Sequence, residues 1–206
     1  MTRFVLRRLM VIGISGFLAS AAQAAGDPAA GGNKFGTCAG CHSIPGYTNA
    51  YPTYHVPRLG GQHADYIIAA LKAYQAGERR HPTMYANAFT LSEQDKLDIA
   101  AFVAEARTAE KPSPVRGNIT AGQAKSETCV ACHGSDGNSP MALYPRLNGQ
   151  HEDYLRKSLQ DYQSGARDNA IMKGIATPLS AQDIADLSAY FASQPDGLTA
   201  VRPRFN

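Results

Sequence analysis

The chain has 206 residues, with 20 basic and 17 acidic side chains, and is long enough for one medium domain or two small ones. Three of the basic side chains and none of the acidic ones lie in the first 24 residues, so the remainder carries 17 of each sign. This balance excludes the basic surplus expected of a nucleic-acid-binding protein, and no charge run is long enough for a membrane-surface patch.

The first 24 residues have the pattern of a secretory signal peptide. Three arginines form a basic region, residues 9–18 form a short apolar run, and residues 22–24 (Ala-Gln-Ala) form a small-x-small cleavage site. The apolar run is shorter than the ~20 residues that cross a bilayer, which disfavours an uncleaved anchor. We therefore expect cleavage near Ala24, export of the mature chain and no transmembrane segment in it.

Two short elements contain all four cysteines. They are Cys38-Ala39-Gly40-Cys41-His42 and Cys129-Val130-Ala131-Cys132-His133, and both have the form C-x-x-C-H. This form is a signature of covalent c-type haem attachment. The two thiols of an element bind the two vinyl groups of one porphyrin, and the adjacent histidine becomes the proximal iron ligand.

Three alternatives compete with haem attachment. A zinc site needs its cysteine pairs about 15–20 residues apart, whereas 87 residues separate these pairs. A thioredoxin-like site needs a strand–helix–strand context that the sequence lacks. Disulfides suit an exported protein but would leave the two histidines without a role. Two such elements behind an export signal favour two covalently bound haem c groups as the cofactors.

An internal repeat divides the chain into two copies. Residues 57–105 align without gaps to residues 145–193, with 22 of 49 positions identical and a constant offset of 88 residues. The two C-x-x-C-H elements are offset by 91 residues, so the first copy has three extra residues in the loop after its histidine. This repeat predicts duplicated domains at residues 25–110 and 118–206, with a proline-rich linker at residues 111–117.

Each copy is predicted to be helical. Apolar residues recur at i, i+4 and i+7 in both copies, as Ile67, Leu71 and Tyr74 and as Leu155, Leu159 and Tyr162. Gly77 and Gly165 lie where a glycine ends a helix. Ser92 and Ser180 each precede an aspartate by three residues, which is an N-cap signature. No strand-like alternation occurs, so the predicted fold class is all-α.

Two methionines are candidates for the second axial ligand of each iron. Met84 and Met172 coincide in the repeat, 42 and 39 residues after His42 and His133. A buried methionine is usually core filler, but matched positions in a chain with few methionines favour ligation. We predict the axial pairs His42 with Met84 and His133 with Met172. Such His/Met ligation gives a higher reduction potential than ligation by two histidines.

The remaining histidines keep one alternative open. His63 and His151 coincide in the repeat and are candidates for bis-histidine ligation. Each is predicted to begin a helix beside a Gly-Gln pair, where capping or surface hydrogen bonding is the simpler role. His55 and His81 occur only in the first copy, and we interpret them as local features.

Four further matched residues are candidates for contacts around the haems. A proximal imidazole donates its second N–H to a carbonyl, and Pro57 and Pro145 are suited to supply that carbonyl. Equally, each proline can be an ordinary loop residue whose carbonyl does not bind the histidine. Arg58 and Arg146 are candidates for pairing with haem propionates, because a guanidinium binds carboxylates in a bidentate way.

These residues resemble those of the dihaem class I cytochromes c of the cytochrome c4 type. Twice over, the chain has a C-x-x-C-H, a Pro-Arg-Leu-x-Gly-Gln segment, a distal methionine and a closing helix. The first copy departs from this pattern at residues 43–55, which replace a short glycine-rich loop. The resemblance implies two tandem class I cytochrome c domains that pack face to face about a pseudo-two-fold axis, with haem propionates near their interface.

The resemblance also implies a function. It predicts a periplasmic electron carrier without catalytic residues, which shuttles single electrons between a donor complex or dehydrogenase and a terminal oxidase or reductase. One alternative is a dihaem oxidoreductase enzyme, which would need an open iron coordination site and a substrate pocket. Another is the haem subunit of a dehydrogenase complex, which would have a permanent partner.

Overall fold

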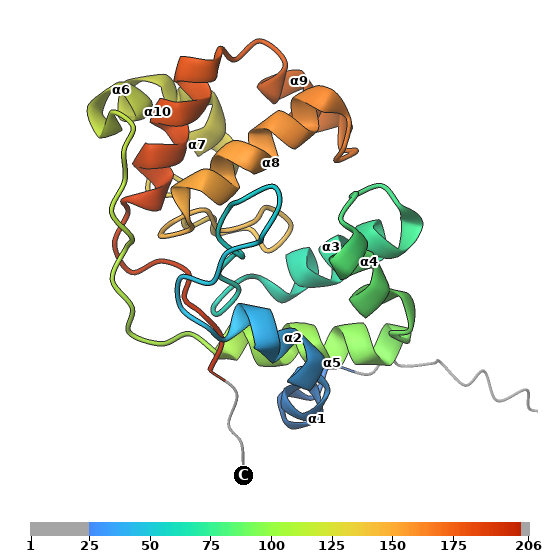
Figure 1. Ribbon diagram of the computed structural model, residues 1–206. Coiled ribbons are helices and arrows are strands. Elements are labelled where there is room, and N and C mark those ends of the chain that lie inside the picture. The colour runs from blue at the N-terminus through green and yellow to red at the C-terminus, as the bar shows by residue number, and fades with distance from the viewer. Residues whose placement is uncertain (1–24, 203–206) are drawn as a thin grey trace, which may run out of the picture.

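The computed structural model describes residues 25–202, which form ten α-helices arranged in two halves (Figure 1). The first half contains α1 (Pro28–Lys34), α2 (Gly36–His42), α3 (Ala64–Ala76), α4 (Pro82–Phe89) and α5 (Glu93–Glu105). The second half contains α6 (Ile119–Lys125), α7 (Glu127–His133), α8 (Glu152–Ser164), α9 (Ala170–Ala176) and α10 (Ala181–Ala192). Within the described residues β structure is limited to three isolated bridges. The predicted all-α class is therefore confirmed.

Two of the segments expected from the sequence, the signal peptide and the linker, are not among the described helices. The expected signal peptide, residues 1–24, lies outside the described residues. The expected linker, residues 111–117, contains neither helix nor strand and runs along one side of the molecule between the halves (Figure 1). In the part of the chain that is described, every helix is too short or too polar to span a bilayer.

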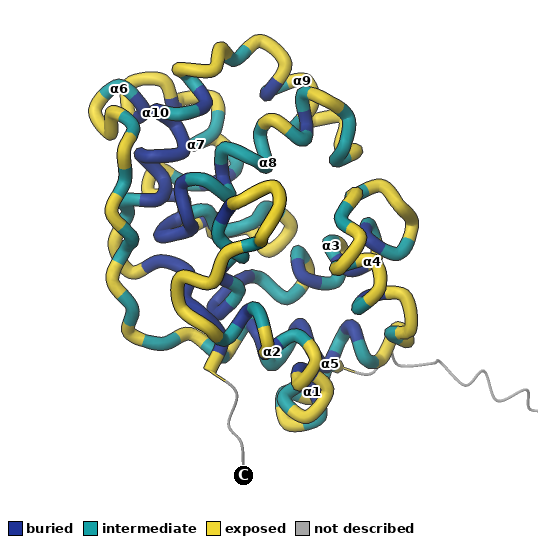
Figure 2. Tube along the Cα trace, in the orientation of Figure 1, coloured by how far each residue is buried: buried dark blue, intermediate teal, exposed yellow. Residues whose placement is uncertain are grey.

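The same helix packing forms the core of each half. α1 and α3 pack on α5, and α6 and α8 pack on α10. The predicted apolar face of residues 67–74 is buried, together with Phe35, Ile99 and Val103. In the second half, Leu155 and Tyr162 are buried and Leu159 is partly exposed. Both α5 and α10 contain buried residues, which Figure 2 shows in dark blue.

The long helices begin and end at matched residues, as predicted. α3 and α8 both end at a left-handed glycine, Gly77 with φ of 76° and Gly165 with φ of 75°. At the start of α5 and α10, Ser92 and Ser180 accept a hydrogen bond from the backbone of the aspartate three residues later. The carboxylate of that aspartate accepts a bond from the serine N–H in return. Both helices thus begin with a complete capping box.

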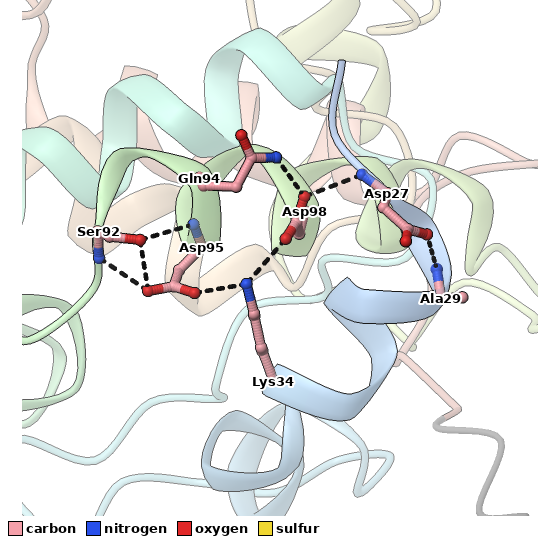
Figure 3. A network of polar contacts seen from close by, with 7 residues as sticks. All are labelled: Asp27, Ala29, Lys34, Ser92, Gln94, Asp95 and Asp98. Atoms are coloured by element: carbon pink, nitrogen blue, oxygen red, sulfur yellow. Dashed lines mark hydrogen bonds and ion pairs between the residues drawn. The ribbon is translucent and has the colours of Figure 1, made fainter. Parts of the chain in front are cut away.

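A buried carboxylate joins the first helix of each half to its closing helix. Asp98 accepts hydrogen bonds from the N–H of Asp27 at 2.9 Å, from Nε2 of Gln94 at 2.7 Å and from Nζ of Lys34 at 2.8 Å (Figure 3). The matched Asp186 accepts bonds from Asn118, Gln182 and Lys125. The two aspartates are 3% and 2% exposed. The bond from Asp27, followed by those from Lys34 and Gln94, lowers the pKa of Asp98 to about 2.

This lowered pKa predicts how the stability of the protein depends on pH. The unfolded chain takes up a proton at the ordinary value near 3.8, whereas the folded chain keeps the Asp98 carboxylate charged down to about 2. The stabilisation is present above pH ~4 and is lost as the pH falls to ~2. We expect Asp98→Asn to reduce the free energy of unfolding at pH 7 and to flatten its fall between pH 4 and pH 2. Urea unfolding at each pH measures both effects.

The exposed residue Asp65 provides a control for this prediction. Asp65→Asn should leave the acid dependence as it is in the wild type. An equally steep fall in Asp98→Asn and the wild type would contradict the role of Asp98.

Reciprocal hydrogen bonds from the repeated Arg-Leu-x-Gly-Gln segments join the two halves. The side chain of Gln150 accepts a bond from the N–H of Arg58 and donates one to its carbonyl, both at 2.9 Å. Gln62 forms the same pair with Arg146, at 2.9 and 3.0 Å. Each arginine also donates through Nη1 to the glycine carbonyl that precedes the partner glutamine. The repeated segment of each half therefore binds its own copy in the other half.

Candidate haem sites

The two C-x-x-C-H elements form short helices in the two halves. α2 and α7 each have seven residues, with the cysteines at the third and sixth positions and the histidine last. A spacing of three residues brings both thiols of a pair to one helix face. All four cysteines are free and partly exposed. The structure therefore has no disulfide at either pair, and both pairs are open to covalent attachment.

The zinc alternative finds no ligand set in the structure. Residues 25–202 contain no group of three or more His, Cys, Asp or Glu side chains placed to hold a metal ion. The cysteine pairs belong to α2 and α7, which lie in different halves (Figure 1). Burial raises the pKa of Cys38 and of Cys129, which keeps these sulfurs as thiols at neutral pH.

The histidine of each element is buried and oriented by a proline carbonyl. His42 and His133 are 7% and 6% exposed. Nδ1 of His42 lies 3.0 Å from the carbonyl oxygen of Pro57, and Nδ1 of His133 lies 2.9 Å from that of Pro145. A carbonyl only accepts, so Nδ1 carries the proton and Nε2 keeps a free lone pair. Both rings thus have the tautomer that ligates a metal through Nε2.

The same burial keeps these imidazoles neutral. Burial lowers the pKa of His42 to about 4, although the bond to Pro57 opposes it. Burial also lowers the pKa of His133. A neutral imidazole is the form that binds iron. Both side chains are therefore ready to ligate at neutral pH.

The two candidate distal methionines lie in the first turn of matched helices, α4 and α9. The N–H of Met84 donates to Nδ1 of His81 at 3.2 Å, and the N–H of Met172 donates to Oδ1 of Asn169 at 3.0 Å. His81, interpreted from the sequence as a local feature, is thus the N-cap of α4. Both methionines are partly buried. Met84 packs on the first core, as Cys38 does.

An apolar cavity lies beside the cysteines of the second half. Its volume is about 210 Å³, and its walls come from α6, α7, α9, α10 and the residues after α9. The lining residues are Lys125, Thr128, Cys129, Gly174, Ile175, Pro178, Leu179 and Leu187. Apolar walls next to a free thiol fit the face of a porphyrin. The residues present therefore suit a covalently attached haem.

Arg58 and Arg146 have protein partners across the interface. Nη2 of Arg58 lies 2.6 Å from a carboxylate oxygen of Glu110, in addition to the bonds that join the halves. The Nε atoms of both arginines are buried and have no hydrogen-bond partner among the described residues. A contact of these Nε atoms with propionates stays a prediction. The bonds to the opposite half give a separate reason for both arginines in the repeat.

A second pair of arginines was not identified from the sequence. Arg79 stacks on Tyr74 and donates to the hydroxyl of Tyr154 in the other half, while Arg167 stacks on Tyr162 and donates to that of Tyr66 at 2.6 Å. These four tyrosines form a cluster with the two arginines. Burial alone would raise the pKa of Tyr66, but the two guanidinium groups outweigh it and lower the pKa to about 8. Among residues 25–202 neither arginine forms an ion pair with a carboxylate. Haem propionates would supply that charge.

Arg79 and Arg167 occupy matched positions in the internal repeat, and this match could have identified them. Both arginines follow the Tyr-Gln-x-Gly segment at matched positions. Only the packing of the two halves brings Tyr154 to Arg79 and Tyr66 to Arg167, so the sequence pattern alone did not assign a role.

The other histidines make contacts between the halves. Nε2 of His63 lies 2.9 Å from the carbonyl oxygen of Ser139, and His151 stacks on His55 with ring centres 4.6 Å apart. Nδ1 of His55 lies 2.7 Å from the carboxylate of Asp153. The ring nitrogen that His63 would offer to iron in a bis-histidine site is thus hydrogen-bonded to the other half.

Comparisons with known proteins agree with this arrangement. The Cytochrome c family model matches residues 119–195. A cytochrome c4 from Azotobacter vinelandii is 34% identical, with 92% of this chain and 98% of that protein covered. A thiosulfate dehydrogenase electron acceptor from Stutzerimonas stutzeri is 30% identical, with 76% of this chain and 78% of that protein covered. The crystal structure of reduced cytochrome c4 from Pseudomonas stutzeri has a TM-score of 0.67 and 31% identity, with 82% of this chain and 100% of that chain covered.

Proposed function

The chain belongs to the cytochrome c4 family, and from this membership we propose that it is a periplasmic carrier of single electrons. It would accept electrons from a donor complex or dehydrogenase and deliver them to a terminal oxidase or reductase. The observation that carries the proposal is the doubled site. Each half has a C-x-x-C-H helix, a buried histidine oriented by a proline carbonyl, and a matched methionine at the start of a helix.

As a cytochrome c4, the protein is a dihaem electron-transfer cytochrome with two covalently bound haem c groups. Haem c supplies a one-electron Fe(III)/Fe(II) couple when it is bound. Cys38 and Cys41 would hold the first group, and Cys129 and Cys132 the second. His42 with Met84 and His133 with Met172 are the proposed axial ligands.

The residues around each site would keep ligation constant during electron transfer. The carbonyl of Pro57 or Pro145 fixes the ring of the proximal histidine. It also makes Nε2 a stronger electron-pair donor to a metal. The N-caps His81 and Asn169 fix the helix turn that carries each methionine. If both the histidine and the methionine of each half ligate, they would leave no open position on the iron for a substrate, which would favour a carrier over an oxidoreductase enzyme.

One relative suggests a specific class of donor. The Stutzerimonas stutzeri protein is named a thiosulfate dehydrogenase electron acceptor. A thiosulfate dehydrogenase is therefore a candidate donor, and a permanent association with such an enzyme is the second candidate function. Reduction of the purified protein by thiosulfate only in the presence of that enzyme would support this donor.

Absorption spectroscopy of the purified protein tests the carrier function. We expect two low-spin haems, a near-infrared sulfur-to-iron band from both ferric irons, and no binding of carbon monoxide to the reduced protein. A high-spin haem, or one that binds carbon monoxide, would favour the enzyme alternative. Co-purification with a large subunit would favour the dehydrogenase-subunit alternative.

A further inference from the structure

The segment that follows α10 leaves the second half and returns to the first. In Figure 1 this segment descends from α10 to the region of α2 and α5. The N–H of Leu198 donates to the carbonyl of Asn148 in the second half at 2.9 Å. One residue later, Thr199 forms an antiparallel bridge with Gly60 of the first half, with bonds of 2.8 and 3.1 Å. We call residues 198–202 the return segment.

The return segment is buried, and its Val201 belongs to the core of the first half. Leu198, Thr199, Ala200 and Val201 are 6% exposed or less. Val201 is 0% exposed and belongs to the first core, with Phe35 and Val103 among its members. This segment was expected to belong to the second domain, whose predicted range was residues 118–206. Val201 of this segment packs in the core of the first half.

The return segment also closes the proximal side of the first candidate haem site. The N–H of Val201 donates to the carbonyl of His42 at 3.0 Å. The N–H of Ala200 donates to Glu110 at 2.8 Å, and the other carboxylate oxygen of Glu110 pairs with Arg58. The cavity that remains has a volume of about 10 Å³, which is room for about one water. Its lining includes Cys41, His42, Pro57 and Ala200.

One difference between the two copies of the repeat reflects the contact of the return segment with Gly60. Gly60 and Asn148 are the mismatch within the otherwise identical Arg-Leu-x-Gly-Gln segments. A Cβ atom at Gly60 would lie 2.6 Å from Oγ1 of Thr199 and 2.8 Å from the carbonyl oxygen of Ala106. The first copy therefore needs a glycine where the return segment crosses it. Within residues 25–202, the carbonyl of His133 receives no matching bond from the first half.

We propose that the return segment positions the proximal side of the first haem, so that the second half tunes the reduction potential of the first. The proposal rests on the haem-binding function proposed above. The bond from Val201 holds the end of α2, which carries His42. The buried segment also keeps water away from that side. Exclusion of water disfavours the more highly charged ferric iron, so the closed wall raises the potential of the first haem. Val201 is thus a positioning residue for the first site.

Three single substitutions in the full-length haem-loaded protein test this proposal. Val201→Pro removes the N–H donor, and Val201→Ala keeps the donor while removing side-chain volume. Arg202→Pro places a proline at the next, exposed residue, whose N–H has no hydrogen bond in the described structure. All three are made in a Met172→His background, which moves the second haem to a different potential. Redox titration then follows the first haem alone.

We expect Val201→Pro to shift the first haem roughly tenfold toward the ferric form, which is a fall of about 59 mV for a one-electron couple. The amides of residues 36–43 should also exchange hydrogen faster. Val201→Ala should shift the potential less, and Arg202→Pro should not shift it. An unchanged potential in Val201→Pro, or equal shifts in Val201→Pro and Val201→Ala, would overturn the role of the hydrogen bond.

Hydrogen exchange of the wild type decides the question if Val201→Pro does not fold. The Val201 amide should exchange as slowly as amides in the middle of α5, because both belong to the first core. Fast exchange through local opening of the return segment would overturn the proposal. This measurement does not depend on the ligands of the iron. A wild type without covalent haem would contradict the proposed function and leave the placement of the return segment to be tested by exchange.

Discussion

Replacement of Met84 by histidine is expected to lower the reduction potential of the first haem and to leave that of the second nearly unchanged. A thioether ligand stabilises ferrous iron relative to an imidazole, so His/Met ligation has the higher potential. Axial ligands span ~0.8 V in haem proteins, and a change of ligand type should cover a substantial part of that span. Stepwise redox titration measures the two potentials, and Met172→His should produce the reciprocal result.

The near-infrared band provides an independent reading of the same substitution. Ferric Met84→His should lose the contribution of one iron to the sulfur-to-iron band and keep that of the other. Met141→His is the matched control, because Met141 is 47% exposed and lies in a loop of the second half. The control should keep both contributions and both potentials. An intact band in Met84→His would show that Met84 is core filler.

Replacement of Gly31 by alanine is expected to destabilise the first half strongly. A Cβ atom at Gly31 would lie 2.0 Å from the backbone oxygen of Asp98 and 2.5 Å from its carbonyl carbon. Both atoms belong to the backbone of α5, so α1 would have to move away. Overpacking of this kind costs about 1–3 kcal/mol or more. It outweighs the gain of ~1 kcal/mol from replacing a helical glycine with alanine. Urea unfolding measures the loss.

Two further glycines separate this clash from helix propensity. Gly122 occupies the matched position in α6, and its Cβ would lie 2.0 Å from the backbone oxygen of Asp186. Gly122→Ala should therefore destabilise the second half in the same way. Gly36 in α2 has no atom within 4 Å of an added Cβ. Gly36→Ala should be neutral or slightly stabilising. Equal stabilities of Gly31→Ala and Gly36→Ala would contradict the close crossing of α1 and α5.

Matched contacts explain why the two halves fold alike, and the unmatched ones explain how they differ. Asp98 and Asp186, the two capping boxes and the glycines that end α3 and α8 are all repeated. The return segment touches only the first site, through His42. The longer loop after His42 also belongs to the first copy only, and its His55 binds Asp153. We therefore expect two haems of different potential.

The sequence by itself determined the number of candidate haem sites, their cysteines and histidines, the helical class and the main helix ends. These features are local: a C-x-x-C-H helix has seven residues, and a capping box involves residues three apart. The repeat extended this reach, because it related Met84 to Met172 without any knowledge of the fold. Residues that act within one helical turn or at matched positions can be identified from sequence alone.

Only the tertiary structure decided what the interface residues do. The bonds from Arg58 to the opposite half, from His63 to Ser139 and from Arg167 to Tyr66 join residues 91, 76 and 101 positions apart in the chain. The return segment likewise joins Val201 to His42. No local pattern encodes which surface of one half meets which surface of the other, because that choice depends on the shape and polarity of both assembled halves.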